Sequence, residues 1–134
     1  MTLEEEIVTK GLTAPRITPA DVEANIVGEY YFTAGDGCVG NVDQDMRPEH
    51  IQSLELLTFC ILVTKNGFTV TGESACASPK NFDAELGRKI ARDNAIEKLW
   101  PLMGYELKTK LHEEEAKNAL VASLGEDDCE GCKI

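Results

Sequence analysis

Residues 56–74 carry the strongest structural signal in the chain. Two runs rich in β-branched and aromatic residues flank the dipeptide Asn66-Gly67, which is the favoured centre of a two-residue type I′ β-hairpin. Such a turn places Lys65 directly opposite Phe68. The segment is therefore predicted to form two antiparallel strands with a fixed register.

This register decides which side chains share a face of the hairpin, because side chains alternate along a strand. It pairs Val63 with Val70 and Ile61 with Gly72. The predicted core face consists of Phe59, Ile61, Val63, Phe68 and Val70. The predicted solvent face consists of Thr64, Thr69, Thr71 and Glu73.

Further elements are predicted before the hairpin. Thr18 and Pro19 provide an N-cap and a first helical position, so a helix over 19–26 is expected. Aromatic residues predict a strand over 29–33, and the glycine-rich, acidic segment 35–49 is predicted as a loop.

A long helix is predicted after the hairpin, over 81–100, with Pro101 ending or kinking it. Its core stripe is Leu86, Gly87, Ile90, Ala91, Ala95 and Leu99. The small residues in this stripe allow a helix to approach a sheet closely. The predicted fold is α+β, a small antiparallel sheet packed against one long helix. The α-β-β-β-α order is also that of double-stranded-RNA-binding domains.

A chain of 134 residues suits a single domain. The predicted organisation is a flexible leader over 1–16, one α+β domain over 17–111 and an acidic tail over 112–134. The tail is expected to contain a short helix over 113–124 and a disordered end.

Composition bounds the setting in which the protein works. The net charge is -11, but residues 51–110 carry 8 basic and 7 acidic side chains, so a local basic patch can still form. No apolar run is long enough for a membrane span. Five cysteines at scattered positions do not suit a disulfide framework and predict a reducing cytoplasm.

Two motifs resemble ligand sites but lack the necessary context. Residues 35–40 spell G-x-G-x-x-G after a strand, yet no βαβ unit follows to hold a dinucleotide. Asp43, Asp45, Glu49 and His50 offer metal ligands, but their spacing is not that of a calcium loop. Neither a cofactor nor a metal is therefore predicted.

The cysteines likewise predict no reaction. Cys129 and Cys132 form a C-x-x-C pair without the second ligand pair that a zinc site needs. Cys76 has only His50 and His112 as candidate bases, both distant in sequence. No catalytic residue is predicted, and the chain is expected not to be an enzyme.

A concentrated basic patch lies at the start of the long helix and comprises Lys80, Arg88, Lys89 and Arg92. Free N–H groups at a helix N-terminus also favour anions. The candidate ligand-binding residues, at the junction of the hairpin end and the helix start, are Glu73, Ser74, Lys80, Arg88 and Arg92. The alternative is ordinary surface charge, in which neighbouring acids pair with these cations.

Two contiguous segments, G-E-S-A-C-A-S-P at 72–79 and G-R-K-I-A-R at 87–92, carry a family resemblance. The chain resembles, over about residues 17–111, the small tailed-phage and prophage proteins named after gene product forty-nine of one coliphage and gene product sixty-six of another. The resemblance implies a phage or prophage origin and an accessory role inside the host cell, and it names no chemistry.

The predicted function is therefore a non-enzymatic binding or regulatory module in the cytoplasm of the host cell, without a membrane association. The expected partner is a host or phage protein. The alternative is binding of a nucleotide or nucleic acid through the basic patch. Self-association is a further option, because Leu120 and Leu124 offer apolar contact on the tail helix.

Overall fold

The computed structural model describes residues 2–40 and 45–132, with side chains described as far as residue 124. Contacts divide the chain into two compact units. The sheet unit is Thr18–Pro101, and the terminal unit combines Met1–Ile17 with Leu102–Ile134. Helix α5 (Ala84–Cys132) contributes to both units.

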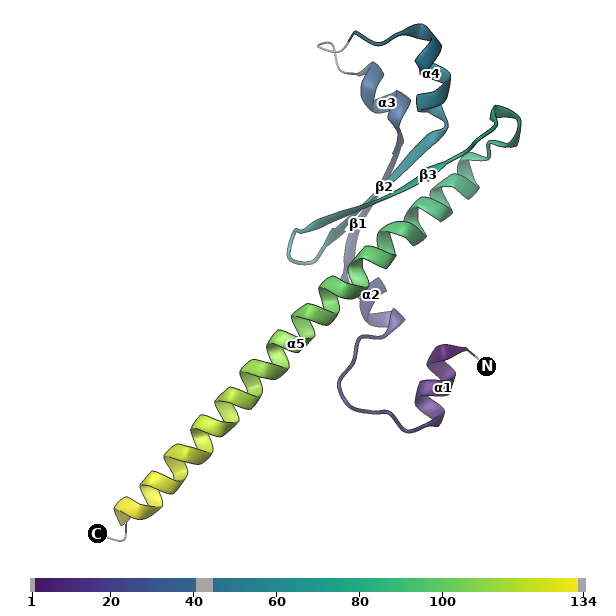
Figure 1. Ribbon diagram of the computed structural model, residues 1–134. Coiled ribbons are helices and arrows are strands. Elements are labelled where there is room, and N and C mark those ends of the chain that lie inside the picture. Colours follow the sequence, from purple (N-terminus) through teal and green to yellow (C-terminus); the bar gives the residue numbers. More distant parts are fainter. Residues whose placement is uncertain (1, 41–44, 133–134) are drawn as a thin grey trace. The chain divides into compact units, whose positions relative to one another are not determined.

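The sheet unit is α+β, as predicted. Its sheet has three antiparallel strands in the order β1 (Ile26–Thr33), β2 (Leu57–Thr64) and β3 (Thr69–Ala75). The first part of α5 runs along one face of this sheet (Figure 1). The predicted strand of 29–33 is part of β1, which begins three residues earlier.

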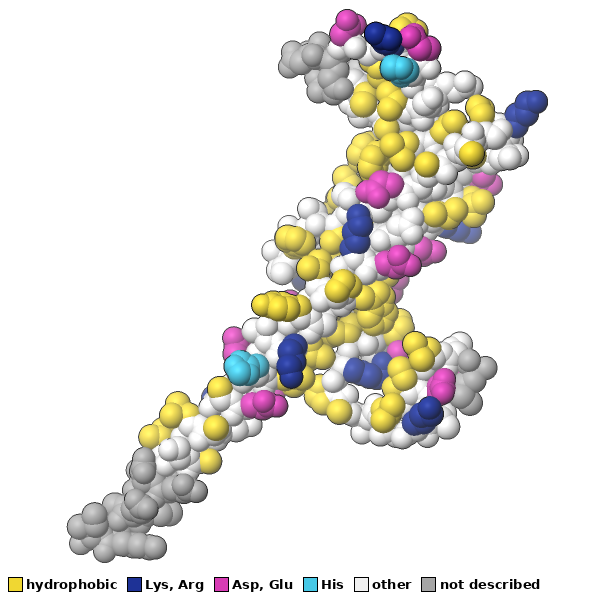
Figure 2. Space-filling view, in the orientation of Figure 1, with side chains coloured by type: hydrophobic (Ala, Val, Ile, Leu, Met, Phe, Trp, Pro, Cys, Tyr) yellow, Lys and Arg dark blue, Asp and Glu magenta, His cyan; other side chains and the backbone are white. Residues whose placement is uncertain are grey.

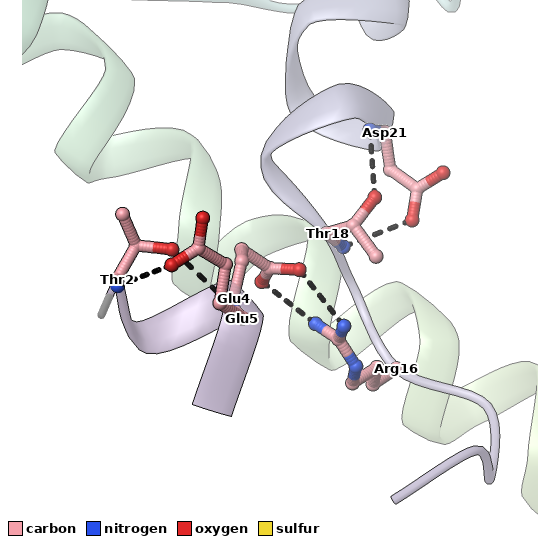
Figure 3. Close-up of polar contacts among 6 residues, drawn as sticks. All are labelled: Thr2, Glu4, Glu5, Arg16, Thr18 and Asp21. Carbon is pink, nitrogen blue, oxygen red and sulfur yellow. Dashed lines mark hydrogen bonds and ion pairs between the residues drawn. The ribbon is translucent and has the colours of Figure 1, made fainter. Parts of the chain in front are cut away.

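Helix α2 (Pro19–Asn25) confirms the predicted N-cap. The Thr18 hydroxyl accepts a hydrogen bond from the Asp21 amide at 3.1 Å, and the Asp21 carboxylate accepts one from the Thr18 amide at 2.9 Å (Figure 3). This reciprocal cap satisfies two N–H groups that the first helical turn leaves free.

The prediction of a loop over 35–49 is wrong. Helix α3 (Ala34–Val39) begins one residue before this segment and occupies its first five residues, and helix α4 (Pro48–Glu55) begins at its end. Thr33 and Asp36 form the same reciprocal cap as in α2, with both hydrogen bonds at 3.1 Å. Local capping therefore outweighs the low helix propensity of the glycines. Residues 41–44 lie outside the described part of the chain.

The predicted hairpin register is wrong by one residue. The Thr64 amide donates to the Phe68 carbonyl at 2.9 Å, and the Gly67 amide donates to the Thr64 carbonyl at 2.9 Å. Gly67 has φ 85°, whereas no other residue type in the described ranges has positive φ. The loop is therefore a type I turn followed by a glycine bulge, with three loop residues instead of two.

The side chain of Asn66 explains this choice of turn. Its Oδ1 atom accepts hydrogen bonds from the Thr64 hydroxyl at 2.6 Å and from the Phe68 amide at 3.0 Å. An asparagine that bonds to its own turn in this way needs no left-handed backbone. Asn66 thus favours the three-residue loop over the type I′ turn.

The shifted register places the other face of the hairpin in the core. Leu62 lies opposite Val70 and Cys60 opposite Gly72. Cys60 and Leu62 are fully buried, and the burial predicted for Val70 is confirmed. Phe68 is 57% exposed, so its predicted place in the core is wrong. The remaining mispredicted residues, Phe59, Ile61 and Val63, are half-buried on the face away from α5, whereas Thr64 is buried.

The predicted close approach of the helix to the sheet is confirmed at Gly72. A β-carbon placed there would lie 2.0 Å from the Ala91 carbonyl oxygen and 2.3 Å from the Ala95 nitrogen. Ala91, Ala95 and Leu99 are fully or almost fully buried. The core residues of the unit are Val22, Ala34, Cys60, Leu62, Val70, Ala91, Ala95 and Leu99.

Helix α5 differs from its prediction at both ends. It begins at Ala84, after the short 3-10 helix η1 (Pro79–Asn81), and continues through Pro101 to Cys132. Leu86 and Ile90 remain partly exposed instead of joining the core.

In the terminal unit, helix α1 (Leu3–Thr9) is capped by Thr2 and Glu5. The Arg16 guanidinium donates two hydrogen bonds of 2.8 Å to the Glu4 carboxylate (Figure 3). Leu120 and Leu124 of α5 are exposed. None of the described helices has the length and apolar character that spanning a membrane requires.

Candidate binding site at the start of the long helix

The end of β3, the start of β2 and the first turns of α5 border a small pocket that is open to solvent on one side, here called the helix-start pocket. Its volume is 130 Å³. It is lined by Leu56, Thr58, Ser74, Ala75, Cys76, Asn81, Phe82, Asp83, Leu86, Gly87 and Ile90. All of these residues belong to the sheet unit.

A tightly bonded connection between β3 and α5 builds one wall of the pocket. The Cys76 amide donates to the Leu56 carbonyl at 3.1 Å, which extends the pairing of β2 and β3 by one step. The Cys76 thiol donates to the Ser78 carbonyl at 3.0 Å. The turn of η1 then delivers Phe82 to the pocket.

Asp83 fixes the position at which α5 begins. Its Oδ1 atom accepts hydrogen bonds from the amides of Glu85 at 3.0 Å and Leu86 at 3.2 Å. The carboxylate thus satisfies two of the free N–H groups at the helix start. An anionic ligand at this helix N-terminus would meet the charge of Asp83.

Two hydroxyl groups lie at the Gly87 end of the pocket. A β-carbon placed at Gly87 would lie 3.3 Å from Oγ1 of Thr58 and 4.0 Å from Oγ of Ser74. Glycine at this position therefore keeps open the space into which these hydroxyls project.

The Thr58 hydroxyl faces the pocket beside Gly87 and has no hydrogen-bond partner among the described residues. Thr58 is 4% exposed, and within the described ranges its side chain makes no hydrogen bond. Every fully enclosed side-chain N or O atom of the described residues does have a partner, so the Thr58 oxygen retains access to the pocket. The Ser74 hydroxyl is likewise unpaired among residues 2–40 and 45–124.

The predicted ligand-binding residues do not form one group. Ser74 lines the helix-start pocket, whereas Lys80 lies on η1 and is not among the lining residues. Glu73 points toward Lys98, with 3.8 Å between Oε1 and Nζ, and its carbonyl accepts a hydrogen bond from Asn94. Arg88 lines a separate cavity of 70 Å³ that shares Thr58 and Phe82 with the helix-start pocket.

Arg92 forms a tie between three elements. Its Nε atom donates to Glu29 of β1, and its two terminal nitrogens donate to Glu23 of α2 at 3.0 Å and 2.7 Å. These hydrogen bonds lower the pKa of both carboxyls and raise the pKa of Arg92. The pairing of Lys89 with Glu85 at 3.9 Å is ordinary surface charge.

The basic patch is consequently smaller than the sequence implied. Lys80 and Arg88 make no ion pair among the residues described, whereas Lys89 and Arg92 are paired. On the face shown in Figure 2, Lys and Arg side chains are interspersed with Asp and Glu side chains.

The other motifs occupy different parts of the fold. The glycines of residues 35–40 lie in α3 and its C-cap, which is not the strand-to-helix turn of a dinucleotide site. The described residues contain no group of three or more potential metal ligands. Asp43 and the side chains of Cys129 and Cys132 lie outside the described part of the chain.

Sequence reasoning missed Thr58, Asn81, Phe82 and Gly87 as pocket residues. A usable signal was present at Thr58, whose hydroxyl lies on the same face of β2 as the apolar side chains of Cys60 and Leu62. The wrong register hid this signal by assigning that face to solvent.

Comparison with known proteins adds a family. No curated protein and no solved structure matches the chain. A family model does match residues 17–111, which include all of the sheet unit and every residue of the helix-start pocket. The chain belongs to the Phage protein (N4 Gp49/phage Sf6 gene 66) family.

Proposed function

We propose that this phage-family protein is a non-enzymatic binding module that acts in the cytoplasm of the host cell and holds part of its partner in the helix-start pocket. The observation that carries the proposal is the Thr58 hydroxyl, which has no hydrogen-bond partner within the described ranges and remains accessible from the pocket. A ligand that expels water from this hydroxyl must replace the lost hydrogen bond, so the pocket favours a ligand group that can bond to it.

The chemistry of the pocket favours binding over catalysis. Its thiol, Cys76, donates to a backbone carbonyl, and its carboxylate, Asp83, caps α5. The residues that line it include no histidine or lysine that could act as a base toward a hydroxyl. The groups offered to a ligand are neutral hydroxyl and amide groups on apolar walls, beside the carboxylate of Asp83.

The proposed partner is a host or phage protein, because the pocket matches the size of a single side chain. A binding pocket for a whole drug-sized molecule is usually larger, at roughly 300–1,000 Å³. A protein partner would use the pocket as the anchor of a wider contact.

Nucleotide or nucleic-acid binding is a second candidate, favoured by the unpaired cations Lys80 and Arg88 among the described residues. It requires charge from Arg92 as well, and that guanidinium already bonds to two carboxylates. Retention on immobilised duplex at low salt, lost in Arg88→Gln, would favour this candidate over the protein partner.

Capture from lysate of host cells, followed by native mass spectrometry, tests the proposal. Gly87→Ala places a methyl group against the Thr58 and Ser74 hydroxyls and so blocks the polar end of the pocket. Gly104→Ala on the same helix is the matched control, because its β-carbon would meet nothing within 4 Å. A partner retained by wild type and Gly104→Ala but lost by Gly87→Ala supports the proposal. A partner retained by all three, or by none, contradicts it.

A further inference from the structure

The size of the helix-start pocket limits what it can accept. Its volume of 130 Å³ is close to that of a roughly 150 Å³ apolar cavity known to hold benzene. Leu56, Phe82, Leu86 and Ile90 supply apolar walls. The pocket therefore has room for one aromatic ring and for little more.

The polar end of the pocket selects among rings. The unpaired hydroxyls of Thr58 and Ser74 both face the space beside Gly87. Each can donate one hydrogen bond and accept others. A ring that ended in a carbon atom would leave both hydroxyls unpaired once water was expelled, whereas a ring with a hydroxyl tip can bond to both.

Charge excludes the anionic alternatives. Asp83 lines the pocket, and its carboxylate is held in place by the amides of Glu85 and Leu86. A phosphate or carboxylate would be repelled there, since like charges are unfavourable at short range.

We infer that the helix-start pocket is a phenol-binding site, which takes the side chain of a tyrosine presented by a protein partner. This inference rests on the proposed binding function and names the chemistry of its ligand. Tyrosine combines an apolar ring with a hydroxyl tip and is enriched at protein interfaces.

The position of β3 supports a peptide as the source of the ring. β3 is the last strand in the sheet order, so its outer edge pairs with no strand of the described chain. The Glu73 carbonyl on this edge accepts a hydrogen bond from Asn94 of α5, so a partner segment would pair with the other groups of the edge. Its residues Ser74 and Ala75 line the pocket. An extended partner segment can hydrogen-bond along such an edge while one side chain enters the neighbouring pocket.

NMR titrations of the full chain, read at amide resonances near Thr58, Ser74 and Gly87, test this inference. The probes are p-cresol, the phenol fragment of tyrosine, and toluene, which lacks only the hydroxyl. Binding of p-cresol is expected to be roughly tenfold tighter than that of toluene or more, because a missing hydrogen bond to a buried group weakens binding by about this factor. Equal binding of the two probes, or no binding of p-cresol, overturns the inference.

Variants separate the hydroxyls from the shape of the pocket. Thr58→Val and Ser74→Ala should each weaken p-cresol several-fold and leave toluene unchanged or tighter, so toluene also reports that the pocket is folded. Gly87→Ala should abolish binding of both probes, and Gly104→Ala should alter neither. Unchanged p-cresol affinity in both hydroxyl variants overturns the inference.

A third probe identifies the source of the ring. N-acetyltyrosinamide adds backbone amides to the phenol. If it binds more tightly than p-cresol, the ligand is a tyrosine in a peptide. If it binds more weakly, the natural ligand is a free phenolic compound. Loss of a captured partner in Gly87→Ala without any p-cresol binding would overturn the phenol inference alone. The proposed function would then stand.

Discussion

At the scale of single residues, Arg92 makes the polar contacts that join three elements of the sheet unit. It joins α5 to Glu23 of α2 and Glu29 of β1. Glu29 in turn accepts a hydrogen bond of 2.8 Å from the Tyr31 hydroxyl. The pKa of Tyr31 is raised, mainly because the hydroxyl is buried and to a smaller extent because it donates this hydrogen bond to Glu29. The network thus fixes the helix against the β1 side of the sheet.

Arg92→Met is expected to lower the free energy of unfolding by about 1–3 kcal/mol, because it removes the charge-assisted hydrogen bonds to Glu23 and Glu29 and leaves Glu29 with the Tyr31 hydroxyl alone. Chemical denaturation measures the change. Lys89→Met is the matched control, since its pair with Glu85 is exposed and should contribute less than about 0.5 kcal/mol. Equal effects of the two substitutions would contradict the role assigned to Arg92.

The same carboxylates predict a pH dependence. Arg92 lowers the pKa of Glu23 and Glu29 below the ordinary value of 4.5, so both bind protons less readily in the folded state than in the unfolded state. Their stabilisation is fully present above that value and is lost as the pH falls through the folded pKa values. Denaturation midpoints between neutral pH and pH of about 3 should decline less steeply in Arg92→Met. Parallel declines would refute this account.

At the scale of elements, the contact between β3 and α5 depends on the absence of a side chain at Gly72. The adjacent helix presents its own backbone at Ala91 and Ala95 instead of flexible side chains. Asn94 adds a hydrogen bond of 2.7 Å to the Glu73 carbonyl beside this contact. The helix cannot yield locally without separating from the strand.

Gly72→Ala is therefore expected to lower the free energy of unfolding by about 3 kcal/mol or more, since its β-carbon would overlap the backbone of α5. Thermal denaturation of the variant measures the loss. Gly87→Ala provides a graded comparison, because its closest new contact, at 3.3 Å, is with a side-chain atom. A Gly72 variant as stable as the Gly87 variant would show that the close approach is not obligatory.

The hairpin makes a separate prediction. Asn66→Gly suits a type I′ turn but removes the two hydrogen bonds that Asn66 accepts from Thr64 and Phe68. The variant is expected to be about 1 kcal/mol less stable than wild type. A neutral or stabilising effect in urea denaturation would favour the two-residue loop instead of the observed one.

The hairpin also shows how far the sequence determines the fold. Both strands of the hairpin, the N-terminal cap of α2 and the small-residue stripe of α5 follow from local rules and are present as predicted. The register does not, because Asn66-Gly67 is compatible with two loops that differ by one residue. This single difference exchanged the faces of β2, and with them the location of Thr58 in the candidate site.

At the scale of the whole molecule, α5 is the element that contributes to both units, and Pro101 is the last residue of the sheet unit. Proline inside a helix lacks an N–H group and crowds the carbonyl four residues earlier, here that of Glu97. The helix continues despite this, so its flanking turns must compensate.

Pro101→Ala is expected to raise the free energy of unfolding by about 1–3 kcal/mol by restoring a backbone hydrogen bond. Circular dichroism during thermal denaturation gives the comparison. Gly104→Ala, nearby on the same helix, improves helix propensity by about 1 kcal/mol without adding a hydrogen bond. A Pro101 variant that gains less than this control would show that the proline is accommodated without loss.

The sites of the binding residues illustrate what whole-molecule context adds. Arg88 and Arg92 are one helical turn apart and were predicted to act together, yet only Arg92 meets two carboxylates across the fold. Those partners come from α2 and β1, which the spacing of residues within α5 cannot reveal. Ser74, by contrast, lines a pocket at the junction of hairpin and helix, which is where a ligand site was predicted.

The ion pairs of Arg92 also have a consequence for folding during synthesis of the chain. Its carboxylate partners precede it by 63 and 69 positions. On the ribosome the sheet is therefore synthesised before the helix that covers Cys60 and Leu62, and the nascent chain carries an uncovered apolar surface meanwhile. Translation adds roughly 5–20 residues per second, so the time between synthesis of β3 and synthesis of the covering part of α5 is on the order of seconds. This is long enough for a chaperone to bind the uncovered strands.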